Sequence, residues 1–184
     1  MLEKFSTWLR SIAKGWLVLV FFAIEIAFMG FILPTAEATI KSYSGGIGPI
    51  DLMIAPAPET LANAITAYGT EGRAFYTTIE LTADILYPIA YAFFYSLLIS
   101  FIFKRAFNPE NKVHWLNVLP FGAWLFDLIE NIIILTLFSG FPNLPAPLLG
   151  ALMLVNTIKW SFAGLSILSL VFGLSAWVFK KIKR

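Results

Sequence analysis

Two carboxylic acids and an amide lie close together in a long apolar stretch of the chain, residues 119–138. Asp127, Glu130 and Asn131 have the spacing i, i+3 and i+4, so a helix presents all three on one face. A carboxylate that faces lipid costs about 2.5 to 3.5 kcal/mol even on a lenient insertion scale. We therefore expect this face to point toward protein or water, with the other helices around it.

Other polar side chains are expected at a similar depth. A polar stripe with the spacing i, i+4, i+7 and i+11 is predicted on the helix that comes before residues 119–138 in the chain. It consists of Glu80, Asp84, Tyr87 and Tyr91. Counting 1.5 Å per residue from the helix ends places Glu25, Asn156 and Lys159 at or outside the middle of a membrane as well. These residues predict a polar cavity that opens outward, with Arg73 able to reach its rim.

Carboxylates outnumber cations in this set, and that excess indicates proton-transfer chemistry. At least one carboxyl group is expected to hold a proton or a bound cation. A protonated carboxyl group can act as a general acid near neutral pH. The candidate catalytic residues are Asp127, Glu130, Asp84 and Lys159. The candidate substrate-binding residues are Asn131, Tyr87, Tyr91, Glu80, Arg73, Asn156 and Glu25.

Each candidate has an expected role. Asp127 and Glu130 would act as acid and base, assisted by Asp84. Lys159 and Arg73 would hold an anionic head group, because a cation orients an anion. A site built from carboxylates prefers a hard ion such as Mg²⁺, but the sequence contains no fixed metal-binding motif. The sequence does not specify a cofactor.

The composition is that of an integral membrane protein. Of the 184 residues, 59% are hydrophobic and 13% are charged, whereas soluble domains carry about 25% charged residues. The length suits a single domain. The absence of cysteine excludes disulfides, thiol catalysis and iron–sulfur clusters. The single histidine, His114, excludes a multi-histidine metal site within one chain.

Four apolar segments predict an all-α, four-helix transmembrane bundle. The expected spans cover residues 15–34, 81–103, 118–138 and 148–179. Pro34 is expected to end the first helix, because proline interrupts helical hydrogen bonding. Residues 35–80 are predicted to form a long extracytoplasmic loop with one or two short amphipathic helices, and residues 104–117 a cytoplasmic loop.

Basic residues indicate the orientation. They flank the N-terminus, the 104–117 loop and the C-terminus, where Lys180, Lys181, Lys183 and Arg184 end the chain. The positive-inside rule then predicts a protein of the cell membrane with both termini in the cytoplasm. A cleaved signal peptide is the alternative for the first segment. Its apolar run of about 19 residues exceeds the usual 7–15 and contains Glu25, which favours a retained helix.

Three functions are compatible with this pattern. The first is a membrane enzyme that performs acid–base chemistry on an amphipathic or lipid-like substrate. The second is a small proton- or cation-coupled transporter. Four spans with a glutamate in the first resemble the general plan of the small multidrug transporters, although this chain is longer and has a large first loop. The third is a binding or assembly protein whose polar cluster fixes the helix register.

The expected partners follow from the membrane setting. They are the lipid bilayer and a lipid-like or small amphipathic ligand, and no nucleic acid is expected. Ser169 and Gly173 are small residues at i, i+4, which suits close helix contact or a homo-oligomer.

Overall fold

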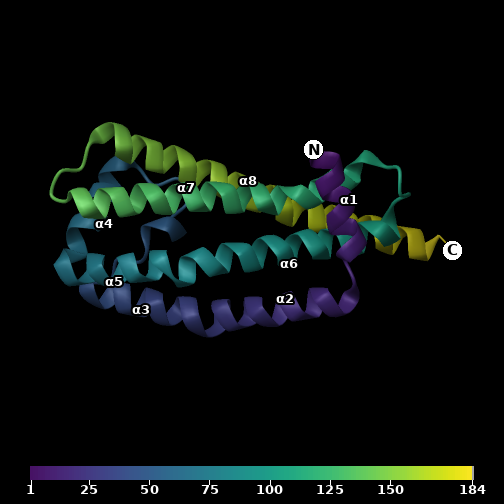
Figure 1. Ribbon diagram of the computed structural model, residues 1–184, viewed down its shortest axis with the longest axis horizontal. Helices are drawn as coiled ribbons and strands as arrows, with labels where there is room; N and C mark the ends of the chain where they lie inside the picture. The colour runs from purple at the N-terminus through teal and green to yellow at the C-terminus, as the bar shows by residue number, and fades with distance from the viewer. Residues whose placement is uncertain (184) are drawn as a thin grey trace.

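The computed structural model describes residues 1–183, and this part of the chain is helical along most of its length and contains no strand (Figure 1). Arg184, the last residue of the basic C-terminal cluster, lies outside the described residues. The elements in chain order are α1 (Leu2–Ile12), α2 (Gly15–Ala27), the π-helix η1 (Phe28–Ile32), α3 (Leu33–Tyr43), the 3₁₀ turn η2 (Ile50–Leu52), α4 (Pro58–Ala67), α5 (Gly69–Leu81), α6 (Ala83–Ala106), the 3₁₀ segment η3 (Lys112–Val118), α7 (Leu119–Gly140) and α8 (Ala146–Ile182).

Four helical segments are long and apolar enough to cross a membrane. They are Gly15–Tyr43, Ala83–Ala106, Lys112–Gly140 and Ala146–Ile182. A helix satisfies its backbone N–H and C=O groups internally, which is what a hydrocarbon environment requires. The expectation of an all-helical protein with four candidate membrane spans is therefore confirmed.

The first candidate span continues beyond the residue at which we expected it to end. α2 passes through η1 into α3, which ends at Tyr43 and not at Pro34. The N–H of Leu33 donates to the carbonyl of Phe28, five residues earlier, so a wide turn lies directly before Pro34. A wide turn accommodates the proline ring and its missing N–H. The predicted end at Pro34 is wrong for this reason.

α6, α7 and α8 form the centre of the bundle. α7 packs along α8, and α6 packs against both. The first span packs mainly through α2 along α6. Figure 1 shows α2 and α3 on one side of α6, with α7 and α8 on the other. The first span and α8 therefore lie on different sides of α6, and both contribute to the site described below.

The segment between the first and second spans folds over one end of the bundle. α4 and α5 lie at the end opposite the chain termini (Figure 1). Tyr68 and Tyr76 from this segment are almost fully buried and pack with Ile134 and Leu137 of α7. This segment is therefore part of the main hydrophobic core.

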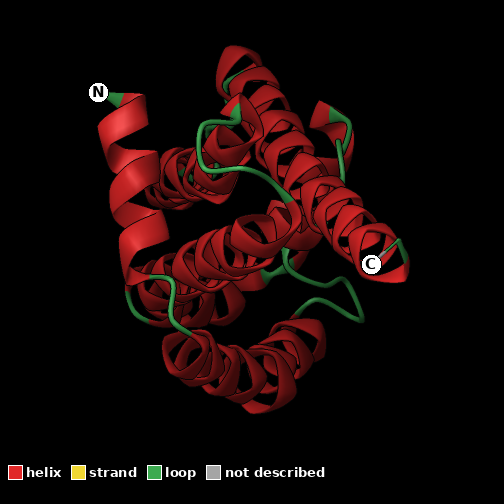
Figure 2. Ribbon diagram, turned by 90° about the vertical axis from the view of Figure 1, so that its right-hand side faces the viewer, coloured by secondary structure: helices red, strands yellow, loops and turns green. Residues whose placement is uncertain are grey.

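The other end of the bundle holds both termini (Figures 1 and 2). α1 lies across the bundle axis there and packs against η3 and α6. The hydroxyl of Ser6 donates to the carbonyl of His114 at 3.2 Å, and the amide of Asn117 donates to the carbonyl of Ser6 at 3.1 Å. His114 thus lies in the packing at this end, far along the bundle from α4 and α5.

Candidate functional site

Lys159 of α8 is at the centre of a buried polar cluster. Its ammonium lies 3.2 Å from Oδ1 of Asp127 and also forms an ion pair with Oε2 of Glu130. It donates a third hydrogen bond, of 2.9 Å, to the backbone carbonyl of Asp51. The residue is only 7% exposed, so its three donors are used within the protein.

α7 supplies the acidic side of the cluster. Asp127, Glu130 and Asn131 are all buried, as residues on one inward face of a helix are expected to be. The amide of Asn131 donates to Oδ2 of Asp84 at 2.9 Å and to its backbone carbonyl at 3.1 Å. Asn131 therefore fixes the first turn of α6 against α7.

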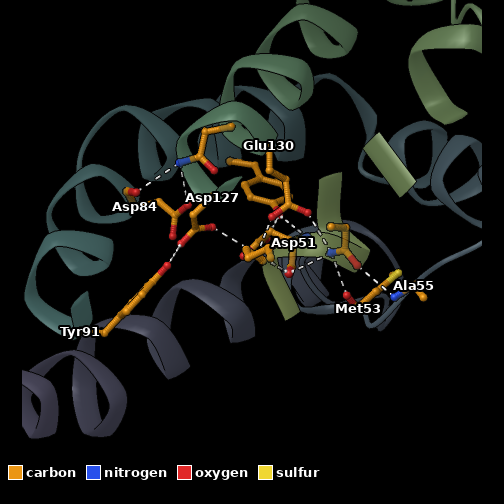
Figure 3. A network of polar contacts seen from close by, with 11 residues as sticks. Asp51, Met53, Ala55, Asp84, Tyr91, Asp127 and Glu130 are labelled. Atoms are coloured by element: carbon orange, nitrogen blue, oxygen red, sulfur yellow. Dashed lines mark hydrogen bonds and ion pairs between the residues drawn. The ribbon is translucent and has the colours of Figure 1, made fainter. Parts of the chain in front are cut away.

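Both carboxylate oxygens of Asp127 are engaged. Oδ1 faces Lys159, and Oδ2 accepts a hydrogen bond of 3.0 Å from the hydroxyl of Tyr91 (Figure 3). The side chain of Asp84 has a different environment. It accepts a hydrogen bond from the neutral amide of Asn131 and forms no ion pair within residues 1–183. Asp127 and Asp84 thus occupy electrostatically unequal environments.

Asn156 connects the cluster to the loop that precedes α4. Its amide nitrogen donates to Oε1 of Glu130 at 2.8 Å and to the carbonyl of Met53 at 2.9 Å. Its amide oxygen accepts a 2.9 Å hydrogen bond from the N–H of Ala55 (Figure 3). A side chain on α8 therefore holds the loop over the buried charges.

Asp51 belongs to the cluster, and our sequence analysis did not include it. It lies in η2 and is 8% exposed, and its Oδ1 accepts a hydrogen bond from the hydroxyl of Tyr76. Burial, followed by the nearby charge of Asp51, raises the pKa of Tyr76 well above its ordinary value. No helical spacing marks Asp51, because a loop brings it to the site. The only sequence signal is an isolated acid in an apolar stretch, residues 50–56.

Glu80 was predicted on one helical stripe with Asp84, but it lies in α5 whereas Asp84 lies in α6, because the helix is interrupted at Thr82. The structure buries Glu80. Its side chain is 1% exposed, and within residues 1–183 neither carboxyl oxygen has a hydrogen-bond partner. Burial, followed by the charges of Asp84 and Asp51, raises its pKa well above the ordinary value. A buried carboxyl group without a partner favours its neutral form.

Two further predicted residues lie apart from Lys159. Arg73 donates to the carbonyl of Ile65 at 3.1 Å and lies 3.7 Å from the ring centroid of Phe141, so it faces the α4 side of the bundle. Glu25 accepts a hydrogen bond of 3.3 Å from the hydroxyl of Tyr87. The structure therefore joins Glu25 to Tyr87 of α6 and leaves Arg73 outside the cluster.

A cavity of about 310 Å³ adjoins the cluster. Asp51, Asp84 and Asp127 line it, and these are the three aspartates of the whole chain. Lys159, Tyr76, Tyr87 and Tyr91 also contribute to its wall. Glu130 and Asn131 do not line the cavity but lie behind the residues that do.

Most of the remaining wall is apolar, although Glu37 and Ser166 also line it. Met29 and Leu33 contribute from the first span, and Ala163 and Ile167 contribute from α8. Met29 and Ile167 are about half exposed on the outer surface of the bundle. The cavity therefore extends from a charged end toward the apolar surfaces of two candidate membrane spans.

The donor set does not form a metal centre. Across residues 1–183, no group of three or more histidine, cysteine, aspartate or glutamate side chains is arranged to hold a metal ion.

Comparison with protein families, with curated proteins and with solved structures finds no match for the chain.

Proposed function

We propose that this protein is a membrane enzyme that transfers protons to and from an amphipathic, lipid-like substrate bound in the cavity. One observation supports this proposal above all others. The same cavity has carboxylates at one end and an apolar wall that leads to the surfaces of two candidate spans. Such a cavity matches a molecule with a polar head and an apolar chain.

In this proposal Asp127 is the general base and Asp84 is the general acid. Lys159 stabilises the charged form of Asp127, and Tyr91 fixes its orientation. Asp84 has no cation partner among the described residues, which favours its neutral form and leaves it a proton to donate. One proton is taken up and one is released, so the charge of the pair is unchanged. Glu130 is a positioning residue, since it reaches the substrate only through Lys159.

The proposal includes the placement in the membrane. We place the four spans in the cell membrane with both termini, and the basic residues near them, in the cytoplasm. The segment of residues 44–81 then lies on the outer side, and the carboxylate-rich cavity opens toward that side and toward lipid. The substrate enters from the bilayer, between the first span and α8.

Turnover of lipid tests the enzymatic proposal. Purified protein is incubated with the total lipid extract of its expression host, and the lipids are compared by liquid chromatography and mass spectrometry. We expect one species to be consumed by the wild type but not by the folded Asp127→Asn variant. Glu59→Gln is the matched control, because Glu59 is exposed on α4, away from the cavity. Unchanged lipids in every sample would contradict the proposal.

The burial of Glu80 favours one alternative, a proton-coupled carrier. A carrier needs a buried group that binds and releases protons, and Glu80 has no hydrogen-bond partner within residues 1–183. Flux measurements in proteoliposomes with an imposed pH gradient distinguish the two functions. A carrier would move an amphipathic cation across the membrane without altering it, whereas the enzyme alters its substrate without a gradient.

A further inference from the structure

The charges on the cavity wall restrict the head group that it can accept. Among the described residues, Lys159 is the one cation on the wall, and it already contacts Asp127 and Glu130. Its charge is therefore compensated within the protein. Asp51 and Asp84 also line the wall, and neither forms an ion pair in the described part of the chain.

A second observation points to an unsatisfied negative site. Glu80 is 1% exposed, neither of its oxygens has a hydrogen-bond partner among residues 1–183, and the charges that act on it most strongly are Asp84 and Asp51. Glu80 precedes Asp84 by four residues, and Asp84 shares the cavity wall with Asp51. None of these three carboxyl groups forms an ion pair within residues 1–183. Like charges in such proximity are costly unless protons or a cation compensate them.

An anionic head group finds no free cation among the described residues of this cavity. Arg73, expected to hold one, lies against Phe141 and Ile65. Lys41 is paired with Glu37 at 2.6 Å. A phosphate or carboxylate in the cavity would face uncompensated aspartates, and juxtaposed like charges cost several kcal/mol.

The aromatic residues of the cavity suit a cation. Tyr76, Tyr87, Tyr91 and Trp160 all line it. The faces of tyrosine and tryptophan rings attract ammonium groups, and aromatic rings recur in sites that recognise such groups. The rings of Tyr87 and Tyr91 lie with their centroids 5.4 Å apart and nearly perpendicular, at 68°. Two ring surfaces therefore flank the charged end of the cavity.

We propose that the ligand of this cavity is an amphiphile with an amine head, which takes the proton of Asp84 and is then held as an ammonium by the carboxylates of Asp84 and Asp51 among the tyrosines. This inference rests on the proposed amphiphile site and specifies its substrate class. The volume of about 310 Å³ is near the lower end of the roughly 300–1,000 Å³ typical of ligand pockets. That size suits one chain, from either a free long-chain amine or a lipid with an amine head group.

The absence of native cysteine permits a direct test of cavity occupancy. An Ala163→Cys variant places one thiol on the cavity wall, and its rate of alkylation by N-ethylmaleimide is measured in a neutral detergent. Three probes are added at neutral pH: dodecylamine, dodecyl phosphate and a lysophosphatidylethanolamine. We expect dodecylamine to slow alkylation at a concentration about tenfold lower than dodecyl phosphate does.

Asp84 is tested in the same assay. We expect Asp84→Asn to raise the protective concentration of dodecylamine about tenfold, and Glu59→Gln to leave it unchanged. Protection by lysophosphatidylethanolamine as well would identify a lipid head group as the source of the amine, and protection by dodecylamine alone would identify a free amine. The comparison of the three probes uses the Ala163→Cys protein, in which all residues of the polar cluster are unchanged. This comparison therefore tests the inference even if Asp84→Asn does not fold.

Two results would overturn the inference, and they have different meanings. If dodecyl phosphate protects the thiol as well as dodecylamine or better, the amine class is wrong while the amphiphile site stands. If no probe protects the thiol, the amphiphile site itself fails, and the proposed function fails with it.

Discussion

At the scale of single residues, the polar cluster depends on Lys159. It compensates Asp127 and Glu130 and also holds the backbone of Asp51, so one side chain joins α7, α8 and the loop. Buried ion pairs do not by themselves make a protein more stable than an apolar core would. Their presence here is in keeping with a site that needs charged groups.

Removal of the Lys159 ammonium should be costly. In Lys159→Met, Asp127 and Glu130 remain buried without a cation, and breaking a buried pair in this way costs about 3–5 kcal/mol. We expect a clear decrease in the thermal unfolding temperature in detergent. Lys159→Met combined with Asp127→Asn should recover part of the loss, because one stranded charge is removed. Equal stability of Lys159→Met and the wild type would contradict the role given to this ion pair.

Asp127→Asn separates a functional cluster from a purely structural one. A variant that folds like the wild type but has lost ligand binding or turnover supports a site. Unfolding or aggregation of this nearly isosteric variant supports the third hypothesis, in which the cluster only fixes helix register. The amide oxygen can still accept a hydrogen bond from Lys159 or Tyr91, so we expect the fold to persist.

Glu80 makes the stability of the protein depend on pH. Burial, followed by the charge of Asp84, raises its pKa above the ordinary value of about 4.3. The folded state therefore holds this proton more tightly than the unfolded chain does. The contribution of Glu80 to the free energy of unfolding is largest below the ordinary pKa. It decreases between the ordinary and the raised pKa, because over this range the unfolded chain has lost the proton and the folded protein still holds it.

Glu80→Gln should reduce this decrease and stabilise the protein at neutral pH. Thermal unfolding measured from about pH 4 to about pH 8 tests the expectation. The slope of stability against pH should become smaller, because the amide at position 80 does not titrate. Glu71→Gln, on the exposed side of the same helix, should leave the slope unchanged. Parallel curves for Glu80→Gln and the wild type would refute this account.

At the scale of elements, close contact between helices positions the site. α6 and α8 approach each other at Gly173, where an added Cβ would overlap the ring of Phe103. α7 and α8 approach at Gly122, where an added Cβ would lie 2.5 Å from Cδ1 of Phe162. Small residues permit such approaches between helices in membranes.

Gly173→Ala should therefore destabilise the bundle. Overpacking of this kind costs about 1–3 kcal/mol, because Phe103 is fully buried and cannot move into solvent. Gly164→Ala is the matched control on the same helix, since its Cβ would meet no atom within 4 Å. Thermal unfolding of the two variants provides the comparison. Equal stability of both would show that α6 and α8 have room to separate.

Helical spacing and hydropathy predicted the elements that carry the site, but not the contacts of the loop. Asp127, Glu130 and Asn131 repeat with the helical period, so their shared face could be read from the sequence. Asp51 could not, because the Asn156 and Lys159 hydrogen bonds that hold its loop join residues more than 100 positions apart. The end of the first span was misplaced for a local reason, the π turn before Pro34.

At the scale of the whole molecule, the two ends of the bundle differ in character. The termini, α1 and the basic ends of α6 and α8 lie at one end, and α4 and α5 cover the other (Figure 1). The buried carboxylates of the cluster lie nearer the α4 end, where the loop of residues 44–57 reaches them. This asymmetry agrees with the proposed orientation, in which the basic end faces the cytoplasm.

Single cysteines test that orientation in a chain that has none of its own. Thr60→Cys lies on α4, and Ser11→Cys lies on α1 at the opposite end; both positions are exposed. A membrane-impermeant maleimide should label Thr60→Cys in intact cells, and Ser11→Cys only after permeabilisation. The reverse labelling pattern would show that the topology is the opposite of the one proposed.

The most direct test of the central claim is native mass spectrometry of gently extracted protein, comparing the wild type with Asp127→Asn. If the cavity is a ligand site organised by Asp127, the wild type should carry one stoichiometric amphiphile. The folded variant should lack it, and the mass of the adduct would identify its class. Bare protein in both samples, or the same adduct in both, would contradict the claim that these carboxylates form a ligand-binding site.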